Sequence, residues 1–180
     1  MPSVEVSVST IDELALEIAE LRARVQLTED TLAIYDLKAR YGELVDQRYW
    51  RGNVVDDEHL AVVSKEIAEL FTTDAVWDGG PTLGKAAGRE AIADQMRQTT
   101  LVFSRHLFVK PRIRVQGDEA WGRWDILCPC KTADGESYWM CGYEDDEYVR
   151  TPASLWLHRS MTLTTVFFSS TEAGWDRIFA

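Results

Sequence analysis

Apolar residues in the first part of the chain recur at alternating intervals of three and four residues, which is the spacing of one helix face. Thr10 and Glu13 match a capping box, the pattern that satisfies free backbone donors at a helix start. The stripe that follows is narrow and lies on an otherwise charged segment; its members are Ile11, Leu14, Ile18, Leu21 and Val25. It is too short for an autonomous coiled coil, so we expect it to pack on its own domain or on another subunit.

A second helix is predicted to follow. Thr28, Glu29 and Asp30 supply a cap and the acidic residues that a helix N-terminus favours. A broad apolar face comes next, formed by Leu32, Ile34, Leu37, Tyr41, Leu44 and Val45. Asp46 lies about 140° from Tyr41 on a helical wheel, outside this face. Since acidic side chains are disfavoured at helix C-termini, Asp46 is either solvated or retained for a specific reason.

A third helix is predicted from the spacing of Leu60, Val63, Ile67, Leu70 and Phe71, with a short strand at residues 75–80 after it. Gly79–Lys85 has the glycine and lysine spacing of a phosphate loop, but Ala86 stands where the magnesium-binding Ser or Thr belongs. We therefore expect a β-turn there instead of a nucleotide site. A further helix is expected from Glu90 to Gln98.

From Leu101 onward the chain reads as long strands, with turn signals at Gly117-Asp118 and Asp134-Gly135. Because helices come first and an antiparallel meander comes last, we expect an α+β fold in which a curved sheet wraps over helices and encloses a cavity. With 180 residues and 46% hydrophobic content, the chain suffices for one globular domain. We assign residues 1–30 to a lead and an extra helix, and residues 31–180 to that domain.

The composition of the chain limits the classes of partner and site that it can have. A net charge of -11 argues against nucleic acid and anionic membranes as partners, and favours a neutral or weakly charged small molecule. No apolar run approaches the roughly 20 residues of a membrane span, and no signal peptide is evident, so we expect a cytoplasmic protein. Cys128, Cys130 and Cys141 are too few for a disulfide framework or a zinc site, which predicts buried reduced thiols and no metal.

His106 is the candidate reaction centre because it lies in an apolar stretch, residues 101–115, that reads as a strand. Histidine is the usual proton carrier near neutral pH. A histidine satisfied within the core is the alternative, so a functional role requires a partner, for which Asp46 is the candidate. His59 and His158 lie in segments that look exposed, and we assign them no role.

Several segments together resemble the SnoaL-like branch of the nuclear transport factor two-like superfamily over about residues 30 to 168. They are DLKARYGELVDQR, ELFTTDAVWDGG, GKAAGREAI, SRHLFVKPRI and AWGRWDIL. Within this branch the chain is most similar to the cofactor-independent lyases: bile-acid dehydratase, scytalone dehydratase and hexachlorocyclohexane dehydrochlorinase. The resemblance implies a cone-shaped α+β barrel, with N-terminal helices on the concave side of a curved, mainly antiparallel sheet.

The resemblance also implies a site. The family sets an Asp at the end of the first core helix against a His on a facing strand, here Asp46 and His106, and Tyr41 matches a Tyr of the bile-acid dehydratase pattern. Another acidic residue of that pattern is replaced by Cys128, so that enzyme's substrate is not carried over. The further residues expected to bind substrate are Tyr49, Trp50, Trp77, Phe108, Trp124, Cys128 and Arg159.

The implied reaction needs no cofactor: His106 removes a proton, Asp46 fixes its tautomer, and Tyr41 hydrogen-bonds the departing or enolate-like oxygen. A small aromatic or polycyclic hydroxy compound would lose water or formaldehyde. A ketosteroid-type isomerase, or a non-catalytic binding protein like the small subunits of dioxygenases, remains the alternative.

Assembly is predicted from the strands beyond Trp121. They carry bulky apolar residues on both faces, so both faces of the sheet require burial. Relatives with this His and Asp pair are often trimers built sheet against sheet. We expect a closed homo-oligomer, a trimer in first place and a dimer in second.

Overall fold

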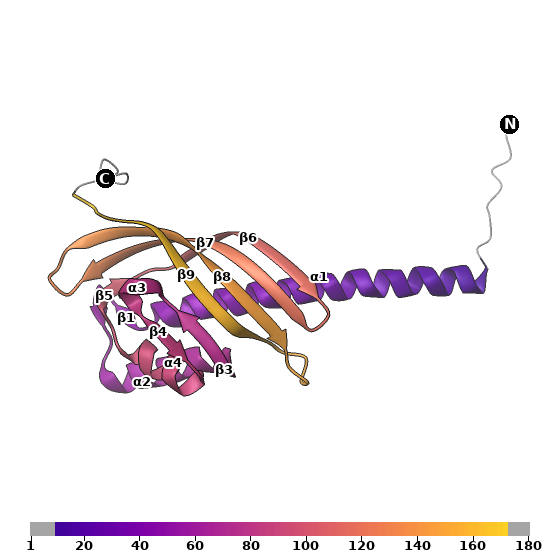
Figure 1. The fold of residues 1–180 in the computed structure, drawn as a ribbon, viewed down its shortest axis with the longest axis horizontal. Coiled ribbons are helices and arrows are strands. Elements are labelled where there is room, and N and C mark those ends of the chain that lie inside the picture. The colour runs from indigo at the N-terminus through magenta and orange to yellow at the C-terminus, as the bar shows by residue number, and fades with distance from the viewer. Residues whose placement is uncertain (1–9, 173–180) are drawn as a thin grey trace.

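One continuous helix, α1 (Ile11–Asp46), forms the first part of the molecule and packs its second half against the rest (Figure 1). The structure is a computed structural model that describes residues 10–172. Thr10 caps α1 through the predicted capping box, in which its side chain accepts a hydrogen bond from the Glu13 backbone. The expected polar lead and the last eight residues of the expected domain lie outside the described residues.

The two helices predicted to meet near residue 28 are one, which corrects the sequence reading. Thr28 and Thr31 donate their hydroxyls to backbone carbonyls four residues earlier instead of capping a new helix. Asp30 does not cap either, because its carboxylate pairs with Arg150 on a distant strand. Burial on α1 begins at Asp30. The division of the chain near this residue stays a prediction.

Three further helices follow: α2 (Asp57–Glu69), the single turn α3 (Gly80–Leu83) and α4 (Arg89–Arg97). The strands are β1 (Tyr49–Trp50), β2 (Asn53–Val54), β3 (Phe71–Asp78), β4 (Lys85–Ala87), β5 (Leu101–Ser104), β6 (Leu107–Gln116), β7 (Glu119–Thr132), β8 (Ser137–Arg150) and β9 (Trp156–Ser170). No helix in the described part of the chain is long and apolar enough to cross a membrane.

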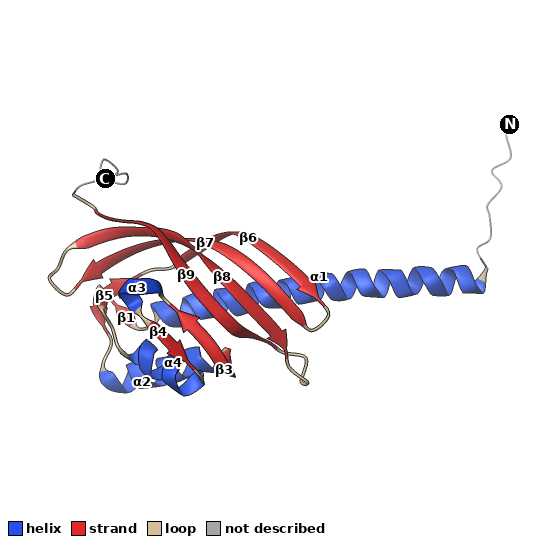
Figure 2. Ribbon diagram, viewed as in Figure 1, coloured by secondary structure: helices blue, strands red, loops and turns tan. Residues whose placement is uncertain are grey.

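The large sheet has the strand order β4-β3-β9-β8-β7-β5, and β6 also pairs with β7. The pairing of β3 with β9 is parallel and the other pairings are antiparallel, so the sheet is mainly antiparallel as predicted. Figure 2 shows the long strands curving over the second half of α1. The hairpins after β6 and β7 turn at Gly117-Asp118 and Asp134-Gly135, where the turn signals lie. The α+β cone fold is confirmed.

The strand expected at residues 75–80 is β3 (Phe71–Asp78), and three other local features differ from the prediction. Phe71 opens β3 and is not the end of α2. The turn expected at Gly79–Lys85 contains α3, and the Gly79 N–H donates to the Gly84 carbonyl at 2.8 Å to close it. His106 does not lie within a strand but in the two-residue break between β5 and β6. That break matters because it frees the His106 backbone N–H to bind a side chain.

The core lies between α1 and the concave face of the sheet. The buried face of α1 includes Ile34, Tyr41 and Val45 from the predicted apolar face. His158, which we expected to be exposed, is fully buried on β9. Its ring stacks on Phe71 with centroids 4.9 Å apart, because alternation along β9 directs it inward.

Candidate active site

A largely apolar cavity of about 320 Å³ opens between α1, α4 and the strands of the large sheet. This volume is at the lower end of the range for small-molecule sites. Five of the residues predicted for the site line it: Tyr41, Tyr49, Trp77, His106 and Cys128.

His106 and Asp46 form a hydrogen-bonded pair at the wall of this cavity. Asp46 Oδ1 lies 2.8 Å from His106 Nδ1 and also accepts the His106 backbone N–H at 3.0 Å. Because a carboxylate can only accept, Nδ1 carries the ring proton and Nε2 holds the free lone pair. Within the described residues no hydrogen bond reaches Nε2. The ring therefore presents an unoccupied base to the cavity.

Asp46 occupies the last position of α1, and its side chain extends beyond the helix end to the break between β5 and β6. Its other oxygen, Oδ2, is paired with Arg105 Nε at 3.2 Å. Three donors thus satisfy a carboxylate whose side chain is only 5% exposed. They offset the unfavourable dipole of the helix C-terminus. Asp46 is therefore retained for a specific contact and is not a solvated residue.

Tyr41 lies on the buried face of α1 and contributes its hydroxyl to the same cavity. The hydroxyl oxygen accepts a hydrogen bond from Trp77 Nε1 at 3.1 Å. Burial, together with the nearby charge of Glu144, raises the pKa of Tyr41 well above its ordinary value. Tyr41 is thus neutral. Because its oxygen accepts the hydrogen bond from Trp77, its own O–H remains available to donate to a ligand.

Cys128 and Cys130 project from alternate positions of β7 into the cavity wall, and both are unpaired thiols. The hydrogen bond with Cys130, together with burial, raises the pKa of Cys128. A protonated buried thiol is a poor nucleophile. The predicted burial is confirmed for these two cysteines, while Cys141 is half-buried.

Two aromatic residues predicted to bind substrate belong to the core instead. Trp124 is fully buried, and its Nε1 donates to the Tyr148 hydroxyl at 2.9 Å. The ring of Tyr35 packs edge-on against it at 5.3 Å, so α1 covers the face that we expected to meet a ligand. Phe108 packs beneath the Lys38 ammonium, 4.4 Å from its ring centroid. The structure thus corrects the expected placement of both.

Two further predicted residues lie on the surface. Trp50 is 70% exposed on β1 and faces a neighbouring surface cleft. Arg159 pairs with Glu119 and Glu147 at the outside of β9, at 2.7 and 3.3 Å. Neither residue lines the cavity. For Arg159 the reason is alternation along β9, which turns its side chain outward while that of its neighbour His158 points inward.

The sequence reading missed a buried charged cluster beside the cavity, formed by Lys38 on α1 with Glu144 and Asp146 on β8. Lys38 Nζ donates to a carboxylate oxygen of each, at 2.7 Å for Asp146. Burial alone would lower the pKa of Lys38, but the two carboxylates outweigh it and raise that pKa. Glu144 lines the cavity.

Asp146 and His158 complete the interior side of this cluster. Burial raises the pKa of Asp146 to about 6 despite the opposing charge of Lys38. Burial, and then the charge of Lys38, holds the pKa of His158 well below its ordinary value. Strand alternation was the available signal: in SYWMCGYEDDEYV, Glu144 and Asp146 share a parity with the buried Met140 and Tyr148.

In the described part of the chain no group of three or more His, Cys, Asp or Glu side chains is placed to hold a metal ion.

The family follows from a direct match: the sequence model described as "SnoaL-like domain" aligns with residues 26–162, most of the chain. The chain belongs to the SnoaL-like family. A search of curated proteins finds no match. Many solved structures match this chain. The three described below are less than 25% identical to it, so they show likeness of fold alone.

Three of these structures illustrate the range. A proposed aromatic ring hydroxylase from Novosphingobium aromaticivorans is 24% identical, with TM-score 0.64, covering 80% of this chain and 94% of its own. A proposed scytalone dehydratase from the same organism is 19% identical, with TM-score 0.64 and coverage of 79% and 87%. The hexachlorocyclohexane dehydrochlorinase LinA-type3 from Novosphingobium barchaimii is 20% identical, with TM-score 0.64 and coverage of 88% and 95%.

Proposed function

We propose that this SnoaL-like protein is a cofactor-independent lyase acting on a small aromatic or polycyclic hydroxy compound. The observation that carries the proposal is the hydrogen bond of 2.8 Å between Asp46 and His106 Nδ1, which leaves Nε2 free at the wall of an apolar cavity. The proposed scytalone dehydratase and the dehydrochlorinase among the structural neighbours support this reaction class.

In the proposed mechanism, Nε2 of His106 removes a proton next to an activating group of the substrate. Asp46 fixes the ring tautomer and stabilises the imidazolium that forms. Tyr41 donates its hydroxyl hydrogen bond to the oxygen on which charge develops, while Trp77 holds that hydroxyl in place. For loss of water, the electron pair of the broken C–H bond forms the double bond, the C–O bond breaks, and the departing hydroxyl takes the proton back from the His106 imidazolium. For loss of formaldehyde, Nε2 instead takes the proton of the hydroxymethyl O–H, the C–C bond to that group breaks, and the carbon left behind is reprotonated by the imidazolium.

The cavity wall also supports a second candidate. Glu144 is a carboxylate that faces the same cavity as Tyr41, the arrangement of base and hydrogen-bond donor that a ketosteroid-type isomerase uses. Lys38 occupies one of its oxygens, however, whereas Nε2 of His106 is unoccupied. We therefore place the lyase first.

We also propose that the protein is cytoplasmic and homo-oligomeric.

Turnover without a cofactor tests this function. Purified protein, dialysed against a chelator, is incubated with a panel of aryl hydroxymethyl and polycyclic hydroxy compounds, and products are identified by mass spectrometry. We expect loss of water or formaldehyde from a panel member, and a fall in kcat of about tenfold or more in Tyr41→Phe. Products of double-bond migration would instead indicate the isomerase. A requirement for added metal or nicotinamide would contradict the proposal.

A further inference from the structure

The first half of α1 is an exposed helix that no residue between 10 and 172 covers. Every residue from Ile11 to Glu29 is exposed, and Figure 1 shows this segment extending away from the sheet. The apolar stripe noted in the sequence continues to Leu32, and its exposed fractions range from 45% to 85%; its members are Ile11, Leu14, Ile18, Leu21, Val25 and Leu32. Burial of such a stripe stabilises a helix in water, and exposed apolar stripes of this kind mark interaction surfaces.

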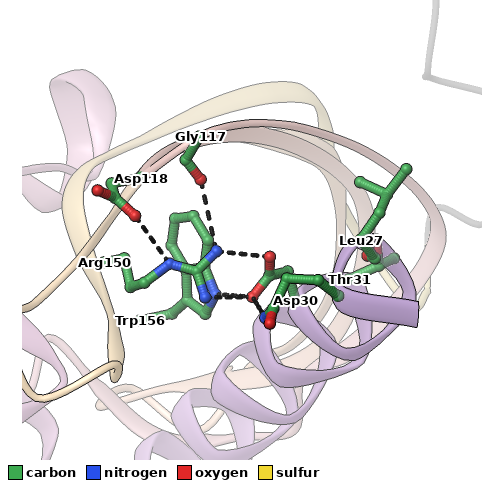
Figure 3. Close-up of polar contacts among 8 residues, drawn as sticks. Leu27, Asp30, Thr31, Gly117, Asp118, Arg150 and Trp156 are labelled. Carbon is green, nitrogen blue, oxygen red and sulfur yellow. Dashed lines mark hydrogen bonds and ion pairs between the residues drawn. The ribbon is translucent and has the colours of Figure 1, made fainter. Parts of the chain in front are cut away.

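The part of the domain that the structure describes is not that partner. At 100° per residue, Asp30 and Ile34 lie about 140° to 180° round the helix from the mean direction of the stripe. These two buried residues fix how α1 meets the sheet. The Arg150 guanidinium donates to both carboxylate oxygens of Asp30, at 2.5 Å each, and Trp156 Nε1 donates to Oδ1 at 3.2 Å (Figure 3). The stripe therefore faces away from the domain, which leaves another molecule to cover it.

The identity of the stripe residues specifies a second copy of this chain. Successive heptads place Ile11, Ile18 and Val25 at the first position and Leu14 and Leu21 at the fourth. β-Branched residues at the first position with Leu at the fourth favour a parallel, two-stranded coiled coil. We infer that the exposed half of α1 pairs in this way with the same segment of a second copy.

The flanking charges fit this pairing. In a parallel pair, the seventh position of one helix meets the fifth position of the next heptad in its partner. Glu17 then meets Arg22 of the second copy, and Arg24 meets Glu29. Both contacts join opposite charges and each occurs twice by symmetry. Leu16 and Leu27 lie off the stripe and take no part.

The exposed half of α1 is short for a coiled coil, but its attachment to the domain compensates for this. An isolated helix of this length is marginal in water, since nucleation is costly. Here α1 is already nucleated where the domain holds Asp30 and the residues beyond it, and the capping box holds its other end. Pairing therefore only has to stabilise a helix that exists.

Charge exchange in the full-length protein tests the inference by sedimentation equilibrium. Glu17→Arg and Arg22→Glu should each weaken dimerisation by about tenfold or more, because each sets like charges together at two places. The double variant should restore the wild-type dissociation constant. Glu20→Arg, on the outer side of the helix, is the matched control and should change it little.

Orientation is tested by Leu21→Cys. In a parallel pair this residue meets its own copy, so mild oxidation should give a covalent dimer; in Glu20→Cys it should not. A monomer at micromolar concentration, a trimer, a dimer indifferent to the charge exchange, or no disulfide at residue 21 would each overturn the inference.

A second inference concerns Glu144. It rests on the proposed function in one respect, which is that the cavity receives the substrate. Glu144 is 5% exposed and lines the cavity, and its Oε2 accepts from Lys38. Among the described residues nothing hydrogen-bonds its Oε1. An acceptor that the protein leaves unpaired at the wall of a largely apolar cavity is available to a ligand that supplies a donor.

The chemistry of this wall selects the ligand class. A neutral alcohol or phenol donates to Oε1 in a charge-assisted hydrogen bond, whereas a hydrocarbon leaves it unpaired and a substrate carboxylate is repelled. Lys38 is shared between Glu144 and Asp146 and does not line the cavity, so it offers nothing to an anion. We propose that Glu144 binds the hydroxyl group of the substrate and selects neutral hydroxy compounds.

Binding of 2-naphthol and naphthalene, followed by tryptophan fluorescence, tests this without reference to turnover. Wild-type protein should bind 2-naphthol at least about tenfold more tightly than it binds naphthalene. Glu144→Gln should reduce the preference severalfold, because Lys38 takes the amide oxygen, the amide nitrogen turns to the cavity, and the charge-assisted hydrogen bond is replaced by a neutral one. Glu147→Gln, exposed on the same strand, should retain it. Equal binding by wild type, or a preference retained in full in Glu144→Gln, would overturn the assignment, whether or not the lyase activity is found.

Discussion

His106→Ala and Asp46→Asn should each lower turnover of an identified substrate by about 10²-fold or more while the fold persists. His106→Ala removes the base itself. Asp46→Asn replaces an acceptor by a side chain that can also donate, so the ring can adopt the tautomer with its proton on Nε2, as in a serine protease whose triad Asp is replaced by Asn.

The matched control for this pair is His59→Ala, since His59 is exposed at the first turn of α2 and lines only the neighbouring cleft. It should leave kcat and KM unchanged. Near wild-type kcat in either His106→Ala or Asp46→Asn, with circular dichroism showing an intact fold, would exclude His106 as the base.

Lys38→Met should destabilise the protein by about 3–5 kcal/mol near neutral pH, because it leaves two buried carboxylates without their counter-charge. The loss should depend on pH. Burial already raises the pKa of Asp146 to about 6, and removal of Lys38 raises it further. The folded state then binds a proton that the unfolded chain releases, so the stability of the variant falls as pH rises through this range and recovers as pH falls.

Urea unfolding at about pH 8 and about pH 5, at one fixed protein concentration, measures both effects. Arg123→Met is the matched control. Its partner Asp145 lies between Glu144 and Asp146 on β8 but points outward, and the side chains of this pair are 41% and 31% exposed. Loss of this pair should cost at most about 1 kcal/mol. Equal losses in the two variants would contradict a buried cluster.

Local signals predicted the features that depend on local chemistry. The capping box at Thr10 and the hairpin turns at Gly117 and Gly135 need only nearby residues, and all are found where expected. The predicted helix break near Thr28 failed because a distant residue decides it: Asp30 binds Arg150, 120 positions along the chain, and does not cap. No local pattern reveals such a partner.

The pairing of Asp46 with His106 came from the family resemblance and could not come from a helical wheel. A wheel describes neighbours along the side of a helix, whereas Asp46 reaches past the last turn to the break before β6. The charged cluster, by contrast, was open to prediction. Lys38 lies between Ile34 and Tyr41 on the buried face of α1, and alternation on β8 directs Glu144 inward.

The central claim is that Asp46 holds His106 with its proton on Nδ1 and its free base, Nε2, at the cavity. Heteronuclear NMR of the histidine ring nitrogens, at a pH where the ring is neutral, tests it without knowledge of the substrate. His106 should show a protonated Nδ1 and an unprotonated Nε2, and Asp46→Asn should disturb this pattern. A neutral ring with its proton on Nε2 in the wild-type protein would contradict the account.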